Sequence, residues 1–221
     1  MSTYLVTGAN RGIGLEYCRQ IKAQGHQAIA VCRETSTELE KLGVTVETGV
    51  DITADESVNN FVNRLGNQSI DVLINNAGIA ERVTLDDLDF ASMRRQFEVN
   101  ALGMLRFTKA MLPRLQDGSK IIIMTSRMGS IDDNTSGGSY GYRMSKVAVS
   151  MAGKSLSVDL KPQGIAVAIL HPGLVKTRMT GFRDEAISTE ESVTGLLARV
   201  EELSLANTGI FWHANGEVLP W

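Results

Sequence analysis

The chain has 221 residues, 43% of them hydrophobic and 21% charged, which is enough to bury one substantial core. Its formal net charge of −3 at pH 7 is too small and too mixed to suggest nucleic-acid binding, and no apolar run approaches the ~20 residues that cross a bilayer. We therefore expect neither nucleic acid nor a membrane as a partner. With no signal peptide ahead of the first strand, and with Cys18 and Cys32 expected to be free thiols, the expected compartment is the cytoplasm.

Strand-like and helix-like segments alternate along the chain. In chain order they are a strand at Tyr4–Val6, a helix from a glycine loop to Gln24, a strand at Ala28–Val31, a helix at Glu38–Leu42, a strand at Val44–Val46, a helix at Asp55–Leu65, a strand at Ile70–Ile74, a long helix at Phe90–Leu115, a strand at Ile121–Met124, a helix that carries Tyr142 and Lys146 and ends near Lys161, a strand at Ile165–Leu170, a helix at Glu190–Leu203 and a strand at Ile210–Trp212. Continuously apolar strands indicate a sheet covered on both faces, and strands separated by helices indicate right-handed βαβ units. We predict an α/β fold: a single domain over residues 1–221 with a Rossmann-type, doubly wound, mainly parallel seven-stranded sheet and helices on both faces.

A glycine cluster lies where the first strand turns into the first helix. It comprises Gly8, Asn10, Arg11, Gly12, Ile13 and Gly14. Glycines at such a turn let the backbone approach a pyrophosphate closely, and the helix directs its positive end at the phosphate charge. The spacing differs from G-x-G-x-x-G, and a glycine cluster alone is often only a turn. Its position at the start of a βαβ unit favours dinucleotide binding.

The end of the second strand indicates which dinucleotide is bound. NAD-binding folds carry an acid there that binds the ribose hydroxyls, whereas this chain has Cys32 followed by Arg33. An arginine binds a 2′-phosphate in a fork, and Arg11 offers a second positive contact. We therefore favour NADP(H) as the cofactor. NAD(H) is not excluded, because Glu34 follows closely and Arg33 could be an ordinary surface residue.

Tyr142 and Lys146 stand four residues apart, a spacing that places both on one face of a helix. An ammonium beside a phenol stabilises the phenolate, so we expect a phenol pKa below its usual value of about 10. A phenol so tuned can protonate a carbonyl oxygen or take a proton from an alcohol. A Tyr and a Lys at this spacing often form only a solvated helix face. Together with the dinucleotide signal, however, they indicate an oxidoreductase.

Other enzyme classes find no support in the sequence. The three histidines, His26, His171 and His213, have no companion acids at metal-ligand spacing, and His171 is expected to be structural. Gly-x-Ser-x-Gly and the lysine of a P-loop are both absent, which argues against an α/β-hydrolase and against nucleotide hydrolysis.

Five short motifs occur in an order that resembles the short-chain dehydrogenase/reductase family over nearly the whole chain. They are Thr-Gly-x-x-x-Gly-x-Gly, Asn75-Asn76-Ala77-Gly78, Ser126 after the fifth strand, Tyr142-x-x-x-Lys146, and Pro172-Gly173. The stretch that begins at Ser126, the loop Asp-Asn-Thr-Ser-Gly-Gly and the short C-terminal end also resemble a subgroup of small carbonyl reductases that includes the C-factor signalling proteins.

The resemblance implies a role for each residue that matches a family motif. The catalytic set is Ser126, Tyr142, Lys146 and Asn100, and Asn100 would interrupt its long helix and hold a water that connects to Lys146. The cofactor-binding set is Gly8, Asn10, Arg11, Gly12, Ile13, Gly14, Arg33, Asp51, Ile52, Asn76, Ala77, Gly78, Tyr142, Lys146, Pro172, Gly173, Val175 and Thr177. Within this set, Asp51 and Ile52 would border the adenine, and Asn76 to Gly78 would lie beneath the adenosine ribose. Pro172, Gly173, Val175 and Thr177 would contact the nicotinamide.

Three neighbouring hydroxyls compete with these assignments. Thr125 and Ser130 flank Ser126, which is the family-matched choice. Tyr140 precedes Tyr142, but only Tyr142 is four residues from the lysine. The interval from Ser126 to Tyr142 is a few residues longer than in many members of the family, which bears on the geometry of the loop.

The sequence therefore predicts an NADP(H)-dependent oxidoreductase that reduces a carbonyl to an alcohol or catalyses the reverse. The alternative is an NADP-binding signalling or regulatory protein of the same fold, in which turnover is secondary. Another chemistry on the same scaffold, such as epimerisation or dehydration, is a further alternative. The short segment Leu174–Thr189 favours an open site for small or aromatic carbonyls, and relatives commonly form homodimers or homotetramers.

Overall fold

The computed structural model describes residues 1–221 and contains one seven-stranded sheet with the strand order β3-β2-β1-β4-β5-β6-β7. The strands are β1 Thr3–Thr7, β2 Gln27–Val31, β3 Thr45–Glu47, β4 Val72–Asn75, β5 Lys120–Met124, β6 Ala166–His171 and β7 Phe211–His213. Every pair of neighbouring strands is parallel, so the predicted doubly wound sheet is confirmed and is entirely parallel. Only an isolated bridge between Trp212 and Val218 is antiparallel.

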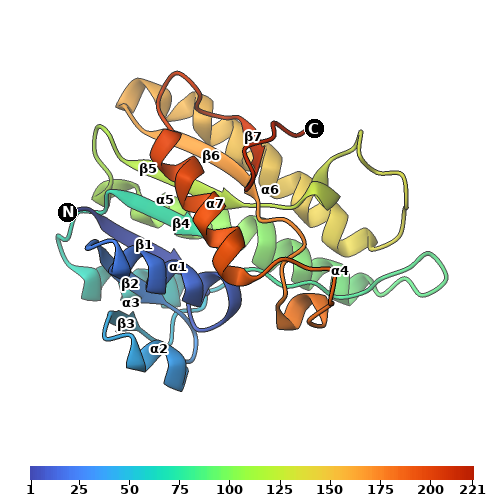
Figure 1. Cartoon of the computed structure of the whole chain (residues 1–221), viewed down its shortest axis with the longest axis horizontal. Coiled ribbons are helices and arrows are strands. Elements are labelled where there is room, and N and C mark those ends of the chain that lie inside the picture. The colour runs from blue at the N-terminus through green and yellow to red at the C-terminus, as the bar shows by residue number, and fades with distance from the viewer.

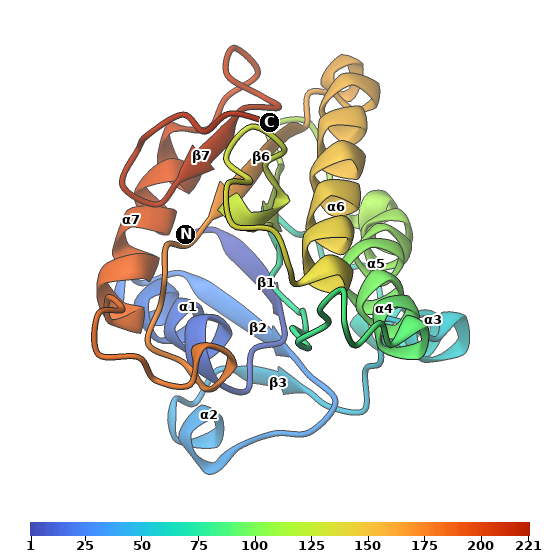
Figure 2. The ribbon, with the colours of Figure 1, turned by 90° about the vertical axis from the view of Figure 1, so that its right-hand side faces the viewer.

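Helices cover both faces of the sheet (Figures 1 and 2). They are α1 Gly12–Ala23, α2 Thr37–Lys41, α3 Asp55–Leu65, α4 Phe90–Phe97, α5 Met104–Met111, α6 Tyr140–Asp159 and α7 Thr189–Glu202. Helices α1 and α7 pack on one face around Tyr17 and Leu196, and α3, α5 and α6 pack on the other around Phe61 and Phe107. Successive strand side chains point to opposite faces, so each continuously apolar strand contributes to both clusters.

The predicted long helix Phe90–Leu115 is not continuous. Helix α4 ends at Phe97, a π-helical turn occupies Glu98–Gly103, and α5 then runs to Met111. A 3₁₀ turn at Leu112–Arg114 follows, because Pro113 has no N–H to continue an α-helix. The local interruption at Asn100 is therefore present, and the predicted end at Leu115 is too late. The predicted strand Ile70–Ile74 also begins too early, because the Ile70 N–H donates to the Arg114 carbonyl outside the sheet ladder.

The strand order reverses between β1 and β4, which are neighbours although two strands separate them in the chain. Ligands of doubly wound sheets bind outside the carboxyl ends of the strands at such a switch point. The loop after β1 contains the glycine cluster, and the loop after β4 contains Asn76 to Gly78. The fold therefore places the two predicted cofactor motifs side by side.

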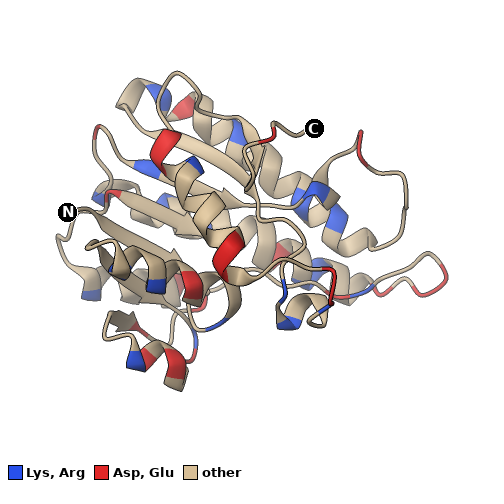
Figure 3. Cartoon of the chain, in the orientation of Figure 1, with Lys and Arg blue, Asp and Glu red and all other residues tan.

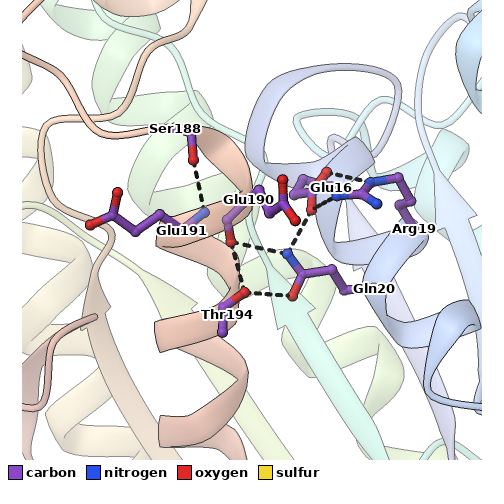
Figure 4. A network of polar contacts seen from close by, with 7 residues as sticks. All are labelled: Glu16, Arg19, Gln20, Ser188, Glu190, Glu191 and Thr194. Atoms are coloured by element: carbon purple, nitrogen blue, oxygen red, sulfur yellow. Dashed lines mark hydrogen bonds and ion pairs between the residues drawn. The ribbon is translucent and has the colours of Figure 1, made fainter.

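A polar network fixes α7 against α1, the helix that follows the glycine cluster (Figure 4). The Gln20 amide donates to Glu16 Oε1 at 2.6 Å and to the Glu190 carbonyl at 3.0 Å, and it accepts from Thr194 Oγ1 at 3.2 Å. Ser188 Oγ accepts from the Glu191 N–H at 3.0 Å and caps the start of α7. The segment that returns from β6 to α7 therefore ends at a fixed point beside α1.

Charged residues of both signs are interspersed over the molecule (Figure 3). No helix is both long enough and apolar enough to span a membrane. No group of three or more His, Cys, Asp or Glu side chains is arranged to hold a metal ion. Cys18 and Cys32 are both buried and free.

Candidate active site

Tyr142 and Lys146 lie on the first two turns of α6, and Lys146 is buried with 6% of its surface exposed. The Lys146 ammonium lies 5.6 Å from the centroid of the Tyr142 ring and donates a hydrogen bond to the Met124 carbonyl at 2.9 Å. Gly129 allows this close packing, because a Cβ there would lie 2.8 Å from the Lys146 carbonyl carbon. The start of α6 is therefore packed directly onto the carboxyl end of β5.

Ser126 lies just after β5 and is buried. Its Oγ accepts from the Met128 N–H at 3.2 Å, and it lies close enough to Tyr142 for hydrogen bonding from the serine to lower the phenol pKa. The two competing hydroxyls have other partners. Thr125 Oγ1 donates to the Lys146 carbonyl, and Ser130 Oγ accepts from the Asp133 N–H. The structure therefore brings Ser126, rather than its neighbours, to the phenol.

Burial dominates the electrostatics of the pair on α6. Burial raises the pKa of Tyr142 above its usual value, and the hydrogen bond with Ser126 opposes that rise only in part. Burial also lowers the pKa of Lys146 to about 8. The expected lowering of the phenol pKa is therefore wrong for this structure, because spacing in the sequence does not report how far both groups are removed from water.

Asn100 lies inside the π-helical turn and is 2% exposed. Its Oδ1 accepts from the Ile79 N–H at 2.8 Å, and its Nδ2 donates to the Ile79 carbonyl and to Ser145 Oγ, each at 2.9 Å. A Cβ on Gly78 would lie 3.1 Å from Asn100 Oδ1 and 3.7 Å from Lys146 Nζ. Asn100 Oδ1 and the Lys146 ammonium therefore both face the space that the missing side chain of Gly78 leaves open. π-Helical turns often occur at functional sites.

The glycine cluster and the loop after β4 pack closely together. Gly8 has a φ of +65°, and a Cβ there would lie 2.9 Å from Ala77 Cα. A Cβ on Gly14 would lie 2.7 Å from the Asn76 side-chain nitrogen. The Asn76 amide donates to the carbonyls of Thr7 and Gly8 at 3.0 and 3.2 Å, so it joins the ends of β1 and β4.

The N-terminus of α1 has no side-chain cap. Arg11 occupies the capping position with an extended backbone, and no acidic residue lies in the first turn. The unpaired N–H groups and the positive end of this helix suit a phosphate group. Asn10, Gly12 and Ile13 are all partly exposed around this helix end, and Gly12 adopts a φ of +55°.

Arg11 and Arg33 are exposed beside this helix end, and neither side chain forms an ion pair or a hydrogen bond. Asp51 lies close enough to Arg33 for the positive charge of the arginine to lower the pKa of its carboxyl. Burial alone would raise this pKa, but the hydrogen bonds from Thr53 and the charges of Arg33 and Arg106 outweigh burial, so the pKa is below its usual value. Asp51 Oδ1 accepts from the Thr53 N–H and hydroxyl at 2.9 and 2.7 Å. Asp51 Oδ2 has no protein partner.

Pro172 and Gly173 follow β6 and begin the segment that crosses the carboxyl edge of the sheet. Gly173 has a φ of +88°, which favours glycine. Val175 is buried and forms a parallel bridge with Ile187. A Cβ on Gly12 would lie 3.4 Å from Thr177 Cγ2, so this segment contacts the glycine cluster.

A histidine pair at the same edge was missed by sequence reasoning. His171 and His213 lie opposite each other in the register of β6 and β7, with ring centroids 4.9 Å apart. Burial lowers the pKa of His171 to about 3, with further lowering by His213, Arg127 and Lys146. The buried His171 Nδ1 has no hydrogen-bond partner. The two histidines are 42 residues apart in the chain. The only indication in the sequence that they meet is that each lies at the end of a predicted strand.

The residues at the switch point fit a nicotinamide dinucleotide. Gly8 and Gly14 leave no space for side chains in the glycine cluster, and the uncapped end of α1 suits a pyrophosphate. The buried Ser126 and Lys146 and the partly exposed Tyr142 lie at the same edge of the sheet. The fold and this site define an oxidoreductase domain of the Rossmann type.

Comparison with known proteins agrees. A family model described as short chain dehydrogenase matches residues 2–188. The chain therefore belongs to the short-chain dehydrogenase/reductase family, as its motifs predicted, and it is an enzyme of that family. The fold of this family binds a nicotinamide cofactor.

Two curated relatives and one solved structure are similar to the chain. The 1-hydroxy-2-glutathionyl-2-methyl-3-butene dehydrogenase of Rhodococcus sp. (strain AD45) is 41% identical over 226 residues, covering 100% of both proteins. The C-signal protein of Myxococcus xanthus is 46% identical over 155 residues, covering 69% of this chain and 93% of that protein. The NADPH-bound carbonyl reductase from chicken fatty liver is 29% identical with a TM-score of 0.90, covering 100% of this chain and 99% of that one.

Proposed function

We propose that this protein is an NADP(H)-dependent reductase that converts a small-molecule carbonyl to an alcohol, or catalyses the reverse. Ser126, Tyr142 and Lys146 are its catalytic residues. One observation carries this proposal: these side chains, from the end of β5 and the start of α6, lie together at the carboxyl edge of the sheet, with Ser126 and Lys146 buried and Tyr142 partly exposed. The reaction needs such a cluster, because charge develops on the carbonyl oxygen.

The roles follow from the donors that each side chain offers. A bound nicotinamide supplies the hydride that reaches the carbonyl carbon. The Ser126 and Tyr142 hydroxyls donate hydrogen bonds to the carbonyl oxygen, which becomes more negative as the reaction proceeds. Tyr142 gives its proton to that oxygen. Burial raises the pKa of Tyr142, so the phenol is protonated in the free protein and has a proton to give; the transfer then depends on stabilisation of the phenolate by Lys146.

Lys146 stabilises the phenolate that Tyr142 becomes. Its pKa of about 8 leaves most molecules charged at neutral pH while allowing the amine to exchange a proton with its surroundings. Asn100 Oδ1 and the Lys146 ammonium lie on the same side of Gly78. A water held by Asn100 would return a proton to Lys146, in the role that the family pattern gives to this asparagine.

The proposed preference for NADP(H) rests on two arginines whose side chains have no partner within the protein. Arg33 follows β2 and Arg11 lies in the glycine cluster, and both are exposed. A 2′-phosphate would accept charge-assisted hydrogen bonds from both. The carbonyl reductase from chicken fatty liver, with its bound NADPH, supports the same preference. Asp51 and Ile52 would border the adenine, Asn76 to Gly78 would underlie its ribose, and Pro172 to Thr177 would contact the nicotinamide.

The substrate class follows from the relatives and from the short segment over the site. The solved neighbours include carbonyl reductases, and one curated relative is a dehydrogenase whose named substrate bears a hydroxyl group. The segment between Pro172 and α7 is short and ends in the fixed contact with α1. We therefore assign small or aromatic carbonyls as substrates.

A homo-oligomer is also proposed. An apolar groove of about 490 Å³ lies between α4, the π-helical turn and the start of α6, and its lining includes Phe90, Phe97, Leu102 and Met144. Met144 and Phe90 are 54% and 59% exposed. A second copy of the chain would remove this apolar surface from water.

The C-signal relative motivates one alternative, a signalling protein that binds NADP(H) without needing turnover. One experiment separates the two. The protein is incubated with NADPH and a panel of aldehydes, ketones and quinones while nicotinamide absorbance is followed. Carbonyl-dependent oxidation of NADPH supports the reductase. Tight NADPH binding without oxidation by any member of the panel favours the alternative.

A further inference from the structure

Arg106, on α5, connects three parts of the protein that lie apart in the sequence. Its Nε donates to Asp55 Oδ1 at 2.6 Å, and its Nη1 donates to Glu98 Oε1 at 3.0 Å and to the Ile52 carbonyl at 3.2 Å. Ile52 belongs to the loop after β3, Asp55 begins α3, and Glu98 begins the π-helical turn. One guanidinium therefore joins the loop after β3 to the start of that turn.

The same side chain brackets the π-helical turn. Glu98 is the first residue of the turn, and Arg106 lies on α5 beyond its last residue, Gly103, so their ion pair spans the turn from end to end. The turn also packs against the loop after β3, because a Cβ on Gly103 would lie 3.0 Å from Ile52 Cγ1. Turns of this kind are rare and often occur at functional sites.

An arginine suits this position better than other residues. Asp55 and Glu98 are both acidic, and they converge on one guanidinium whose fork offers several donors in a fixed plane. Without the guanidinium, the two carboxylates would repel each other and the Ile52 carbonyl would lose its donor. The loop and the turn would then be joined only by the packing of Ile52 on Gly103.

The position of Asn100 depends on this turn. Asn100 is the third residue of the turn, and its side chain holds both main-chain groups of Ile79 as well as Ser145 Oγ. A shift in the turn would therefore loosen the Ile79 N–H and move Asn100 relative to Gly78 and Lys146.

We propose that Arg106 is a positioning residue of the active site: it holds the π-helical turn that carries Asn100 and couples this turn to the loop at Asp51 and Ile52. The consequence for catalysis rests on the proposed function, in which Asn100 serves the proton path and Asp51 and Ile52 border the adenine. Occupation of the adenine side then stiffens the turn at the catalytic side through one shared guanidinium.

The first test is hydrogen exchange of the cofactor-free protein, which needs no activity. In Arg106→Gln, the amides of Glu98 to Gly103 and the Ile79 amide should exchange about tenfold faster than in the parent. Arg64→Gln is the matched control, because Arg64 also joins a carboxylate and a carbonyl, those of Glu47 and Thr48, but forms no hydrogen bond with the π-helical turn. Unchanged exchange of these amides in Arg106→Gln overturns the proposal, and so does an equal acceleration in Arg64→Gln.

The second test uses adenosine 2′,5′-bisphosphate, which has no nicotinamide and can act on the turn only from the adenine side. In the parent it should slow exchange of Glu98 to Gly103, and in Arg106→Gln this slowing should be lost. Equal slowing in both proteins overturns the coupling. If the parent shows no protection even at the glycine cluster, the cofactor assignment fails, a result distinct from failure of the Arg106 bridge in the first test.

The third test measures the kinetics of carbonyl reduction. Once the parent oxidises NADPH with a carbonyl, Arg106→Gln should lower kcat roughly ten- to a hundredfold with little change in the carbonyl KM, since positioning errors act mainly on the chemical step. Glu98→Gln removes only the ion pair with Arg106 across the turn, so it should lower kcat by a smaller factor. It replaces Arg106→Gln in this test if that variant folds poorly. A parent-like kcat in both variants contradicts a positioning role.

Discussion

The ammonium of Lys146 donates a hydrogen bond to the carbonyl oxygen of Met124 at 2.9 Å. This bond joins α6 to the last residue of β5, only two residues before Ser126. The lysine is thereby held near the phenol of Tyr142 by a main-chain group. Its pKa is lowered by burial and not by this bond, because a carbonyl acceptor favours the charged ammonium.

Ser126→Ala tests the hydrogen bond to the carbonyl oxygen. Removal of one preorganised donor should lower kcat roughly 10²- to 10³-fold while leaving NADPH affinity unchanged, because the proposed role of Ser126 is a contact with the substrate and not with the cofactor. Ser130→Ala is the control, since Ser130 is equally buried nearby but holds Asp133. Steady-state kinetics and an NADPH titration measure both quantities. Equal rates for Ser126→Ala and the parent would remove Ser126 from the catalytic set.

The lowered pKa of Lys146 predicts the pH dependence of carbonyl reduction. Below a pH of about 8 the amine is protonated and stabilises the phenolate, and above it the amine is neutral and does not. The value of kcat/KM for NADPH, which reports groups of the free enzyme, should therefore fall as the pH rises through about 8. In Lys146→Arg the side chain stays charged, so this fall in kcat/KM at alkaline pH should disappear, whatever the value of kcat/KM itself. If kcat/KM of Lys146→Arg falls at the same pH as that of the parent, the titrating group is not Lys146.

Arg33→Asp tests the 2′-phosphate site. The substitution replaces an attraction with a repulsion, and a charge-assisted bond contributes roughly 1.5–3 kcal/mol, so NADPH binding should weaken about ten- to a hundredfold. NADH lacks the phosphate and should bind equally well or better, since a carboxylate can accept from its ribose hydroxyls. Titrations of the parent and the variant with both cofactors measure the preference. A parent that prefers NADH contradicts the assignment, and an unchanged preference in the variant shifts it to Arg11.

His171 predicts how stability changes in acid. Its folded pKa of about 3 lies below the usual value of about 6.5, so between these values the unfolded chain binds the proton and the folded one does not. Stability therefore falls as the pH drops from about 6.5 toward 3, and this group alone should cost about 2 kcal/mol between pH 7 and pH 5.

Urea unfolding of the parent and of His171→Gln at both pH values measures that cost. The variant cannot titrate at this position, so it should lose about 2 kcal/mol less than the parent on acidification. Equal losses in the two proteins would mean that His171 titrates normally in the fold.

The sequence predicted the features that depend on local spacing or on the order of elements. The glycine cluster, the Tyr142–Lys146 pair and Ser126 each follow or begin an element, so the parallel sheet brings them to one edge. The entirely parallel order followed from the alternation of apolar strands and helices. The break at Asn100 was expected from the family pattern, although its π-helical form was not.

Features that depend on contacts between distant residues could not be predicted. The bridge from Arg106 to Glu98 and Ile52 depends on which helix faces share a side of the sheet. The pairing of His171 with His213 depends on the register of β6 and β7. The raised pKa of Tyr142 depends on burial, which the helical spacing of a Tyr and a Lys does not contain.

The central claim is that Tyr142 is the proton donor in a carbonyl reductase, and a single-turnover measurement on Tyr142→Phe tests it most directly. The parent and the variant are each loaded with one equivalent of NADPH, bound equally in both, and mixed with a reactive carbonyl while nicotinamide absorbance is followed. We predict that the parent oxidises its NADPH and that the variant does so roughly 10²- to 10⁴-fold more slowly. Tyr140→Phe, at the start of the same helix, should behave as the parent. Oxidation by Tyr142→Phe at the rate of the parent would contradict the account.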